Sequence, residues 1–248
     1  MQIDMRAMEL LSSKICHDLV SPVSAINNGV ELIEDIGGTV IGEALKLIGD
    51  SAGHAARRLR LFRMAYGRAG SETALAVKDV KAVAGQYMSG GKIVLHWPDN
   101  MPSQKLADSQ GFLKVVLNTL LVAEETLAYG GAISLRSDLS LGKDICRFEI
   151  VGRGAHLSPA AQAALDGTAS IDDLSPRTIQ SYITGRFAEH FGLILTPDQS
   201  VADRLDLTLL LPETASASEP PPSPPDASND SLESPADPQT KVFKESAL

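Results

Sequence analysis

The sequence predicts an α+β fold, in which an N-terminal antiparallel helical hairpin is followed by an α/β sandwich. Two patterns indicate this fold. Through residues 4–36 and 41–66, apolar residues recur at three- and four-residue steps, as they do along one face of a helix. From residue 71 onward, short alternating stretches that are typical of strands separate a few long helical stretches. Such a succession is typical of a sheet that helices cover on one side.

The first helix is predicted from about Asp4 to Ile36. Pro22 lies inside it and removes one backbone hydrogen bond, so a local kink or weakening is expected there. Gly37 and Gly38 follow the helix and provide its C-cap and the turn. Its apolar face consists of Leu11, Ile15, Leu19, Ile26, Val30 and Ile33.

The second helix carries a seam of apolar residues at alternating steps of four and three, which is typical of a coiled coil. The seam consists of Ile41, Leu45, Ile48, Ala52, Ala55, Leu59, Phe62 and Tyr66, and the helix is expected to end near residues 67–70. The short turn makes the two helices an antiparallel hairpin. Because a lone hairpin cannot bury the apolar residues of both helices, we expect a homodimer in which two hairpins form a four-helix bundle.

The second region alternates between predicted helices and predicted strands. Helices are expected at Val77–Met88, Asp108–Tyr129 and Pro176–Phe191, and strands at Lys92–Trp97, Ala132–Ser137, Ile145–Val151, Leu193–Thr196 and Leu205–Leu211. Glycines mark the ends of two of these helices, at residues 130–131 and at Gly192.

These patterns divide the chain into three regions. Residues 1–70 form the hairpin, residues 71–212 form the α/β sandwich domain, and residues 213–248 form a tail. The tail holds seven of the fourteen prolines, together with seven Asp or Glu and two Lys. A segment of this composition cannot bury enough apolar surface to offset the entropy of ordering it, so we predict a disordered acidic tail.

Composition and charge argue against several classes of protein. The net charge of −9 argues against a nucleic-acid-binding face built on excess positive charge. The two cysteines, Cys16 and Cys146, belong to no Cys/His cluster, which argues against a zinc site and a disulfide framework. No apolar run approaches the ~20 residues that cross a bilayer, and the N-terminus lacks the pattern of a secretion signal. We therefore expect a soluble, cytoplasmic protein that binds neither nucleic acid nor membrane.

A histidine with an acidic neighbour, His17-Asp18, stands in the first helix five residues before Pro22. Neutral imidazole is a good nucleophile near pH 7. Asp18 is placed to hold the imidazole tautomer or a metal that a partner brings, and Ser21, one turn on, shares the face of His17. From spacing alone, an ordinary surface histidine and a plain exposed carboxylate remain the alternatives.

Four arginines are expected near His17. In a hairpin, residues equidistant from the turn lie side by side, which places His17 level with Leu59. Around that level stand Arg57, Arg58, Arg60 and Arg63. Guanidinium groups stabilise phosphoryl oxygens or the carboxylates of a docking partner. The alternative is a solvated, arginine-rich helix surface.

The segment around His17 resembles the phospho-acceptor box of sensor histidine kinases. That box is a His-Glu/Asp pair followed by a small hydroxyl residue, a proline and an aliphatic residue, and this chain reads Cys16-His17-Asp18-Leu19-Val20-Ser21-Pro22-Val23. Histidine kinases carry the box on the first helix of a dimeric hairpin, ahead of an α/β ATP-binding domain. The resemblance therefore implies a histidine-kinase-ATPase-like sandwich at residues 71–212, with His17 as the phospho-acceptor.

The nucleotide-binding motifs of that family are incomplete in this chain. Residues 117–123 resemble the asparagine box and retain Asn118, but Val122 stands at its second Asn position. Residues 151–154 resemble the glycine end of an Asp-x-Gly-x-Gly motif, but Ile150 stands at the aspartate position. Thr178-Ile179-Gln180-Ser181 stands where a glycine-rich lid is expected. The resemblance therefore implies weak or absent ATP binding, with Asn118, Gly152 and Gly154 as structural residues.

A phospho-acceptor hairpin joined to a degenerate kinase-like domain is similar to the ChpT-type histidine phosphotransferases of alphaproteobacterial phosphorelays. Residues 17–26 and residues 62–67 also resemble that family. The resemblance implies that His17 takes a phosphoryl group from the phospho-aspartate of a receiver domain in a hybrid histidine kinase, and passes it to the aspartate of a response regulator, without ATP. It implies no cofactor of the chain's own, because the receiver domain supplies the Mg²⁺.

Under this resemblance, several residues are candidates for receiver binding. Val20, Ser24 and Asn28 follow His17 along its face of the helix toward the turn, and Arg60 and Arg63 join them from the second helix. A general helix surface or core role is the alternative for the first three.

Two other functions remain open from the sequence. An active histidine kinase with a divergent nucleotide site would phosphorylate His17 from ATP alone. A non-catalytic dimeric adaptor would bind receiver domains without carrying phosphate, so that His17→Ala keeps signalling. The remaining histidines, His54, His96, His156 and His190, show no mutual spacing for a metal site and are assigned no role.

Overall fold

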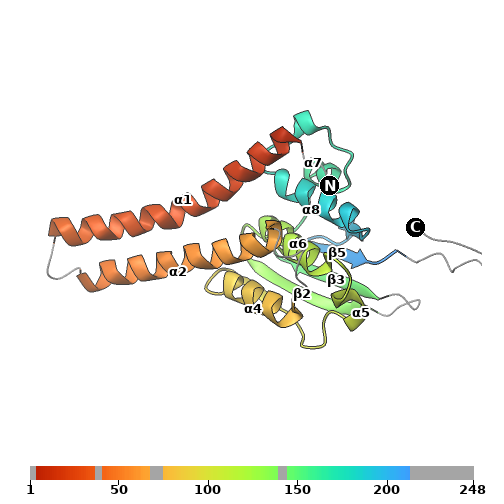
Figure 1. Cartoon of the computed structure of the whole chain (residues 1–248), viewed down its shortest axis with the longest axis horizontal. Coiled ribbons are helices and arrows are strands. Elements are labelled where there is room, and N and C mark those ends of the chain that lie inside the picture. The colour runs from red at the N-terminus through yellow and green to blue at the C-terminus, as the bar shows by residue number, and fades with distance from the viewer. Residues whose placement is uncertain (1–3, 37–40, 68–74, 139–143, 213–248) are drawn as a thin grey trace, which may run out of the picture. The chain divides into compact units, whose positions relative to one another are not determined.

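The structure is a computed structural model that describes residues 4–36, 41–67, 75–138 and 144–212 (Figure 1). Residues 1–212 form one compact unit. The predicted interhelical turn, the boundary between residues 70 and 71, and the predicted tail lie outside the described residues. The division into a hairpin domain and a sandwich domain therefore stays a prediction.

Two long antiparallel helices form the predicted hairpin. Helix α1 (Met5–Ile36) continues through Pro22, and its ribbon bends along its length (Figure 1). Helix α2 (Ile41–Tyr66) runs back beside it. The two helices approach closely at Gly29, where an added Cβ atom would lie 2.6 Å from Ile48 Cγ1. The proline is thus accommodated within the helix, and the predicted hairpin is confirmed.

The predicted apolar seam of α2 is divided between a buried and an exposed face. Phe62 is buried, whereas Leu45 and Leu59 are exposed. Leu61 and Ala65, outside the predicted seam, are buried instead. The reason is that α2 packs against α1 on one side and against α4 and α6 of the following region on another. The predicted seam is therefore only partly buried within the single chain.

The region after the hairpin contains a mixed sheet with helices. Its helices are α4 (Val77–Met88), α5 (Gln104–Ala107), α6 (Phe112–Thr126), α7 (Pro159–Leu165), the 3₁₀ helix η3 (Ile171–Asp173) and α8 (Ile179–His190). Its strands are β1 (Ile93–His96), β2 (Gly131–Asp138), β3 (Ile145–Val151), β4 (Ile194–Asp198) and β5 (Arg204–Leu210). The strand order is β1-β2-β3-β5-β4, and only the β1–β2 pair within this sheet is parallel. The predicted α/β sandwich is confirmed.

Two details of this region differ from the sequence prediction. The helix predicted from Asp108 begins only at Phe112, because Gly111 adopts a left-handed φ of +74° and a Cβ atom there would lie 2.2 Å from the ring of Phe191. The short helices α5, α7 and η3 were not predicted. Each follows a serine whose side chain accepts a backbone N–H, at Ser103, Ser158 and Ser170, and this cap is the signal that would have found them.

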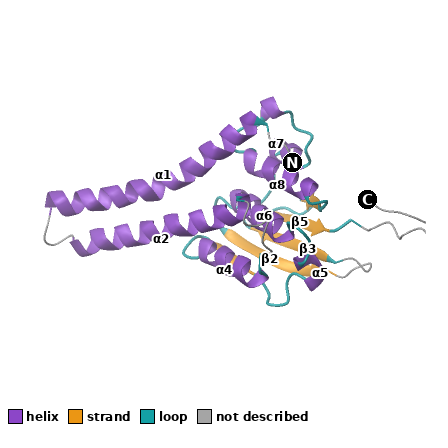
Figure 2. Cartoon of the chain, in the orientation of Figure 1, coloured by secondary structure: helices purple, strands orange, loops and turns teal. Residues whose placement is uncertain are grey.

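The core lies between the sheet and helices α4, α6 and α8, which cover one face of the sheet (Figure 2). Alternate strand residues such as Ile133, Phe148 and Leu207 are fully buried on that face. Several intervening residues of the other face are charged and paired, as in the contact of Arg204 Nη1 with Glu149 Oε1 at 2.9 Å. This alternation explains why the strands could be predicted well.

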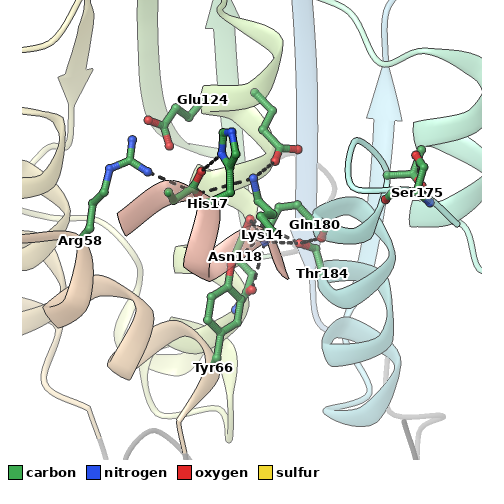
Figure 3. Close-up of polar contacts among 12 residues, drawn as sticks. Lys14, His17, Arg58, Tyr66, Asn118, Glu124, Ser175, Gln180 and Thr184 are labelled. Atoms are coloured by element: carbon green, nitrogen blue, oxygen red, sulfur yellow. Dashed lines mark hydrogen bonds and ion pairs between the residues drawn. The ribbon is translucent and has the colours of Figure 1, made fainter. Parts of the chain in front are cut away.

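Buried polar side chains join the end of α2 to α6 and α8. We call Tyr66, Asn118, Gln180 and Thr184 the interdomain cluster (Figure 3). Asn118 Nδ2 donates to the carbonyl of Ala65 in α2 and to that of Lys114 in α6, both at 2.9 Å. Gln180 Nε2 donates to Asn118 Oδ1 at 3.2 Å, and the Tyr66 hydroxyl donates to Gln180 Oε1 at 2.5 Å. We call residues 75–138 and 144–212 the kinase-like region, after the resemblance given above. Because the hydrogen bonds of the cluster are specific in geometry, they fix how this region is placed on the hairpin.

Asn118→Ala tests how much the interdomain cluster contributes to stability. The substitution leaves the Ala65 carbonyl and the Gln180 amide without this partner, so we expect the free energy of unfolding to fall by about 1–3 kcal/mol. Urea unfolding measures this change. Asn28→Ala, at an exposed position of α1, is the matched control and should change it by less than about 0.5 kcal/mol. Equal stability of the two variants would contradict the role of the cluster.

Candidate active site

His17 stands on the outer surface of α1, and 88% of its side chain is exposed. Its Nδ1 atom lies 3.5 Å from Oδ1 of the neighbouring Asp18. Figure 3 shows His17 with Arg58 and Lys14 on either side of it. The imidazole is therefore open to a partner protein while one of its nitrogens faces a carboxylate.

Asp18 is held by side chains from both helices of the hairpin. Its Oδ2 atom lies 3.3 Å from Arg58 Nη1 in α2 and 3.7 Å from Lys14 Nζ, one turn earlier in α1. Only 20% of its side chain is exposed. One carboxylate oxygen thus faces two cations and the other faces His17.

Lys14 also reaches the kinase-like region, where its Nζ lies 2.6 Å from Glu125 Oε1 at the end of α6. Burial lowers the pKa of Lys14, but the charges of Glu125, Asp18 and Glu124 outweigh this effect and raise the pKa above its usual value. Desolvation raises the pKa of Glu125, and the attraction of Lys14 opposes that rise. We take the pair to be charged at neutral pH, because opposite charges at this distance stabilise each other.

Arg58 has a second set of contacts in the kinase-like region. Its guanidinium carbon lies 5.6 Å from the ring centroid of Tyr87 in α4, within the range of a cation–π interaction. The Tyr87 hydroxyl donates to Glu124 Oε2 at 2.6 Å. Burial raises the pKa of Glu124, and the Tyr87 hydrogen bond and the charge of Arg58 oppose the rise. Both cations that hold Asp18 are therefore themselves held by the kinase-like region.

A cleft of about 900 Å³ lies beside this network. Its walls come from α1, α2, the segment that joins α4 to β1, and the end of α6, and it is lined by Ser21, His54, Arg57, Arg58, Lys92 and Glu124 among others. Burial, together with the charges of Arg58 and Arg57, lowers the pKa of His54 and favours its neutral form. Arg57 and Arg58 give this wall of the cleft two guanidinium groups and make it basic.

The residues predicted for the site occupy different surfaces. Ser21 lines the cleft, while the predicted receiver-binding residues Val20, Ser24, Asn28, Arg60 and Arg63 are all exposed. Of the four arginines, Arg57 and Arg58 line the cleft, and Arg58 is the one paired with Asp18. The sequence predicts that four arginines lie near the level of His17, but it does not distinguish Arg57 and Arg58 from the other two.

The sequence does not predict that Lys14 and Glu125 belong to the site. The four-residue spacing of Lys14 and Asp18 along one helix was the available signal for the first of them. No local pattern connects Glu125 to the hairpin, because 111 residues separate it from Lys14 and only the fold brings the two together.

The remnants of the nucleotide motifs are structural, as the sequence indicates. Asn118 is fully buried in the interdomain cluster. Gly152 lies against the turn before β2, where an added Cβ would be 2.6 Å from the Gly130 carbonyl oxygen. The Gly154 N–H donates to Asp203 Oδ1 at 2.7 Å. These three residues therefore hold the chain's own structure together.

Two further features concern the whole described part of the chain. Within it, no group of three or more His, Cys, Asp or Glu side chains is arranged to hold a metal ion. None of its helices combines the length and the apolar character that a membrane crossing requires.

Cys16 and Cys146 are both free thiols, and burial raises the pKa of Cys146 to about 12.

Comparison with known proteins identifies the family. Residues 77–202 match the family described as "Histidine phosphotransferase C-terminal domain". The protein phosphotransferase ChpT of Brucella abortus (strain 2308) is 31% identical over 198 residues, which cover 78% of this chain and 90% of that protein. The chain belongs to the histidine phosphotransferase family. It acts as a histidine phosphotransferase in a phosphorelay, as the sequence predicts.

A solved phosphotransferase structure agrees with this membership. A bacterial phosphotransferase solved at 1.7 Å is 27% identical and superposes with a TM-score of 0.67, over 84% of this chain and 98% of its own. The histidine kinase AdeS of Acinetobacter baumannii is 12% identical, with a TM-score of 0.42 over 79% of this chain and 96% of its own. The predicted α+β fold class of this histidine phosphotransferase, an N-terminal helical hairpin followed by an α/β sandwich, is confirmed.

Glu124→Gln tests the electrostatics of this phosphotransferase site. Burial raises the pKa of Glu124 in the folded protein. Glu124 therefore contributes most to the stability of the fold when it is protonated, below its unfolded-state pKa of about 4.3, and this contribution is lost as the pH rises through the folded-state pKa. Glutamine removes the charge and keeps an oxygen that can accept from Tyr87. We expect a higher Tm at pH 8, by about 2–4 °C for each kcal/mol gained, and a smaller gain near pH 5.

Glu9→Gln, at an exposed position of α1, is the control for this change of charge. Thermal unfolding of both variants is followed at the two pH values. A lower Tm for Glu124→Gln than for the control at pH 8 would contradict the burial argument.

Proposed function

We propose that this phosphotransferase carries a phosphoryl group on His17 from the phospho-aspartate of a receiver domain, in a hybrid histidine kinase, to the aspartate of a response regulator. The observation that carries the proposal is the exposed imidazole of His17, whose Nδ1 faces Asp18. The Nε2 atom is then the nucleophile that meets the partner. Asp18 and Ser21 complete the proposed catalytic set.

The chemistry needs no ATP. In the first step, the Nε2 lone pair forms a bond to phosphorus, and the electron pair of the broken P–O bond returns to the aspartate of the donor receiver. In the second step, the acceptor carboxylate forms a P–O bond, and the electron pair of the P–N bond returns to Nε2. The receiver domains bring the Mg²⁺, while this chain supplies nucleophile, alignment and docking surface, on which phosphoryl transfer largely depends.

Receiver domains are proposed to dock along the His17 face of α1 and the adjacent cleft. Val20, Ser24 and Asn28 offer exposed side chains there. The basic wall formed by Arg57 and Arg58 complements the carboxylates of a receiver active site. Arg60 and Arg63 are exposed on the same helix and remain candidates for this contact.

A homodimer is proposed because the hairpin exposes apolar side chains at helical spacing. These are Val23 and Val30 in α1, and Ile41, Leu45 and Leu59 in α2. Val23 and Val30 are seven residues apart, and the three residues of α2 belong to the predicted coiled-coil seam. A second copy that covers these residues would form the four-helix bundle. The proposed location is the cytoplasm.

His17→Ala tests the relay. With ATP removed, a phosphorylated receiver domain should transfer its phosphoryl group to the wild-type chain and not to His17→Ala, because the variant has no nucleophile at this position. His190→Ala, at an exposed position of α8, is the matched control and should transfer normally. Radiolabel that reaches His17 from ATP without any receiver would favour the kinase alternative. Retained signalling by His17→Ala would favour the adaptor alternative.

Leu59→Glu tests the homodimer. A charge within the apolar face of a four-helix bundle is costly to bury, so the variant should sediment as a monomer at concentrations where the wild type is a dimer. Val94→Glu, an equally exposed apolar position on β1, should leave the dimer intact. A monomeric wild-type chain in analytical ultracentrifugation would contradict the proposal.

A further inference from the structure

The kinase-like domain places one of its carboxylates next to the phospho-acceptor helix. Glu125 stands at the end of α6, and its Oε1 atom lies 2.6 Å from Lys14 Nζ. The same ammonium group lies 3.7 Å from Asp18 Oδ2. Only 18% of the Lys14 side chain is exposed, so this cation has left most of its hydration for these two partners. Lys14 thus connects Glu125 of α6 to the neighbour of His17.

A second connection runs through α2. Tyr87 in α4 lies under the guanidinium of Arg58, and Arg58 Nη1 reaches Asp18 Oδ2 at 3.3 Å. Arg58 is nearly as enclosed as Lys14, with 19% of its side chain exposed. Two separate helices of the kinase-like domain therefore hold two separate cations, and both cations meet at one carboxylate oxygen.

We propose that the kinase-like domain serves as a positioning element for phosphoryl transfer. Glu125 holds Lys14, Tyr87 holds Arg58, and the two cations orient Asp18, whose Oδ1 then fixes the imidazole of His17. We call these contacts the positioning network. The inference rests on the proposed role of His17 as phospho-acceptor, and it gives the domain a function that does not involve a nucleotide.

The network acts through the tautomer of His17. A neutral imidazole carries its proton on one nitrogen and its lone pair on the other. A carboxylate held at Nδ1 keeps the proton there and leaves the lone pair on Nε2, where the partner approaches. When Nε2 bonds to phosphorus, the ring gains positive charge, and Asp18 stabilises it without removing the Nδ1 proton. No proton has to leave the ring in either direction of transfer.

The domain is needed because the cations would otherwise be mobile. Lysine and arginine side chains on an exposed helix lose rotamer entropy when they are held in one geometry, so an isolated surface pair contributes little. Glu125 and Tyr87 are attached to α6 and α4, and the interdomain cluster fixes α6 on the hairpin. The position of Asp18 thereby depends on the docking of the whole domain.

Glu125→Gln is the variant that tests the inference, because Glu125 lies outside the cleft lining and outside the predicted receiver-binding residues. We expect the single-turnover rate of transfer from a phosphorylated receiver to fall roughly tenfold or more through lost alignment, with the receiver affinity unchanged. In ¹⁵N NMR at pH 8, His17 should change from the Nδ1–H form to a mixture of tautomers. Glu189→Gln, which breaks the pair of Arg186 and Glu189 in α8 outside the cleft lining, is the matched control and should change neither reading.

A charge swap separates positioning from simple stabilisation. The double variant with Lys14→Glu and Glu125→Lys restores an ion pair between α1 and α6, so thermal stability should return toward that of the wild type. It also places a carboxylate beside Asp18, so the transfer rate and the tautomer should stay impaired. Recovery of both rate and tautomer in the swap would overturn the inference, because the pair would then be purely structural.

The outcomes distinguish this inference from the proposed function. If the wild-type chain receives no phosphoryl group on His17, the proposed function itself fails. If the wild type transfers normally and Glu125→Gln matches Glu189→Gln in rate and in the ¹⁵N spectrum, only the positioning inference fails.

Discussion

The attachment of the kinase-like domain to the end of α2 is the constraint on which the rest of this structure depends. Asn118 donates to the carbonyl of Ala65 from one helix and accepts from Gln180 of another, inside a region that excludes water. Leaving a buried polar group without a hydrogen-bond partner costs more free energy than the hydrogen bond itself contributes. Other placements of the domain on the hairpin, which would break these hydrogen bonds, are therefore strongly disfavoured. Lys114, also buried, donates to the Gly67 carbonyl and adds a further contact at the same joint. The hairpin and the sheet are therefore held in one relative position.

This constraint changes what the kinase-like fold is used for. An enzyme that phosphorylates its own histidine from ATP has to bring a bound nucleotide to the imidazole. Here the asparagine at the nucleotide motif is occupied by backbone carbonyls, and Gly152 fits closely against Gly130. The same helix, α6, ends in two carboxylates. Glu125 contacts Lys14, and Glu124 interacts with the charge of Arg58. In the proposed account, the fold serves as a support, and the exposed His17 carries out the chemistry.

The sequence predicted the hairpin, all strands of the described sheet and the position of His17, because each has a local signal. Periodic apolar residues define the helices, alternation defines the strands, and the acceptor box is contiguous. What could not be predicted depends on contacts between distant segments. Nothing near Glu125 reveals Lys14, and the choice of Arg58 over Arg60 follows from which face of α2 meets α1. The division of the α2 seam had the same cause, since its burial depends on packing against α4 and α6.

The central claim is that the kinase-like domain is held in one fixed position on the hairpin. Measuring the distance between the hairpin and the sheet in solution tests this claim most directly. Spin labels at Glu43→Cys in α2 and Thr196→Cys in β4, both exposed positions, report it by pulsed dipolar spectroscopy in a Cys16→Ser background. Labelled chains are diluted with unlabelled chains so that distances within one chain are measured. The account predicts a single narrow distribution that Mg²⁺-ATP leaves unchanged. A broad or two-peaked distribution that shifts with Mg²⁺-ATP would contradict it.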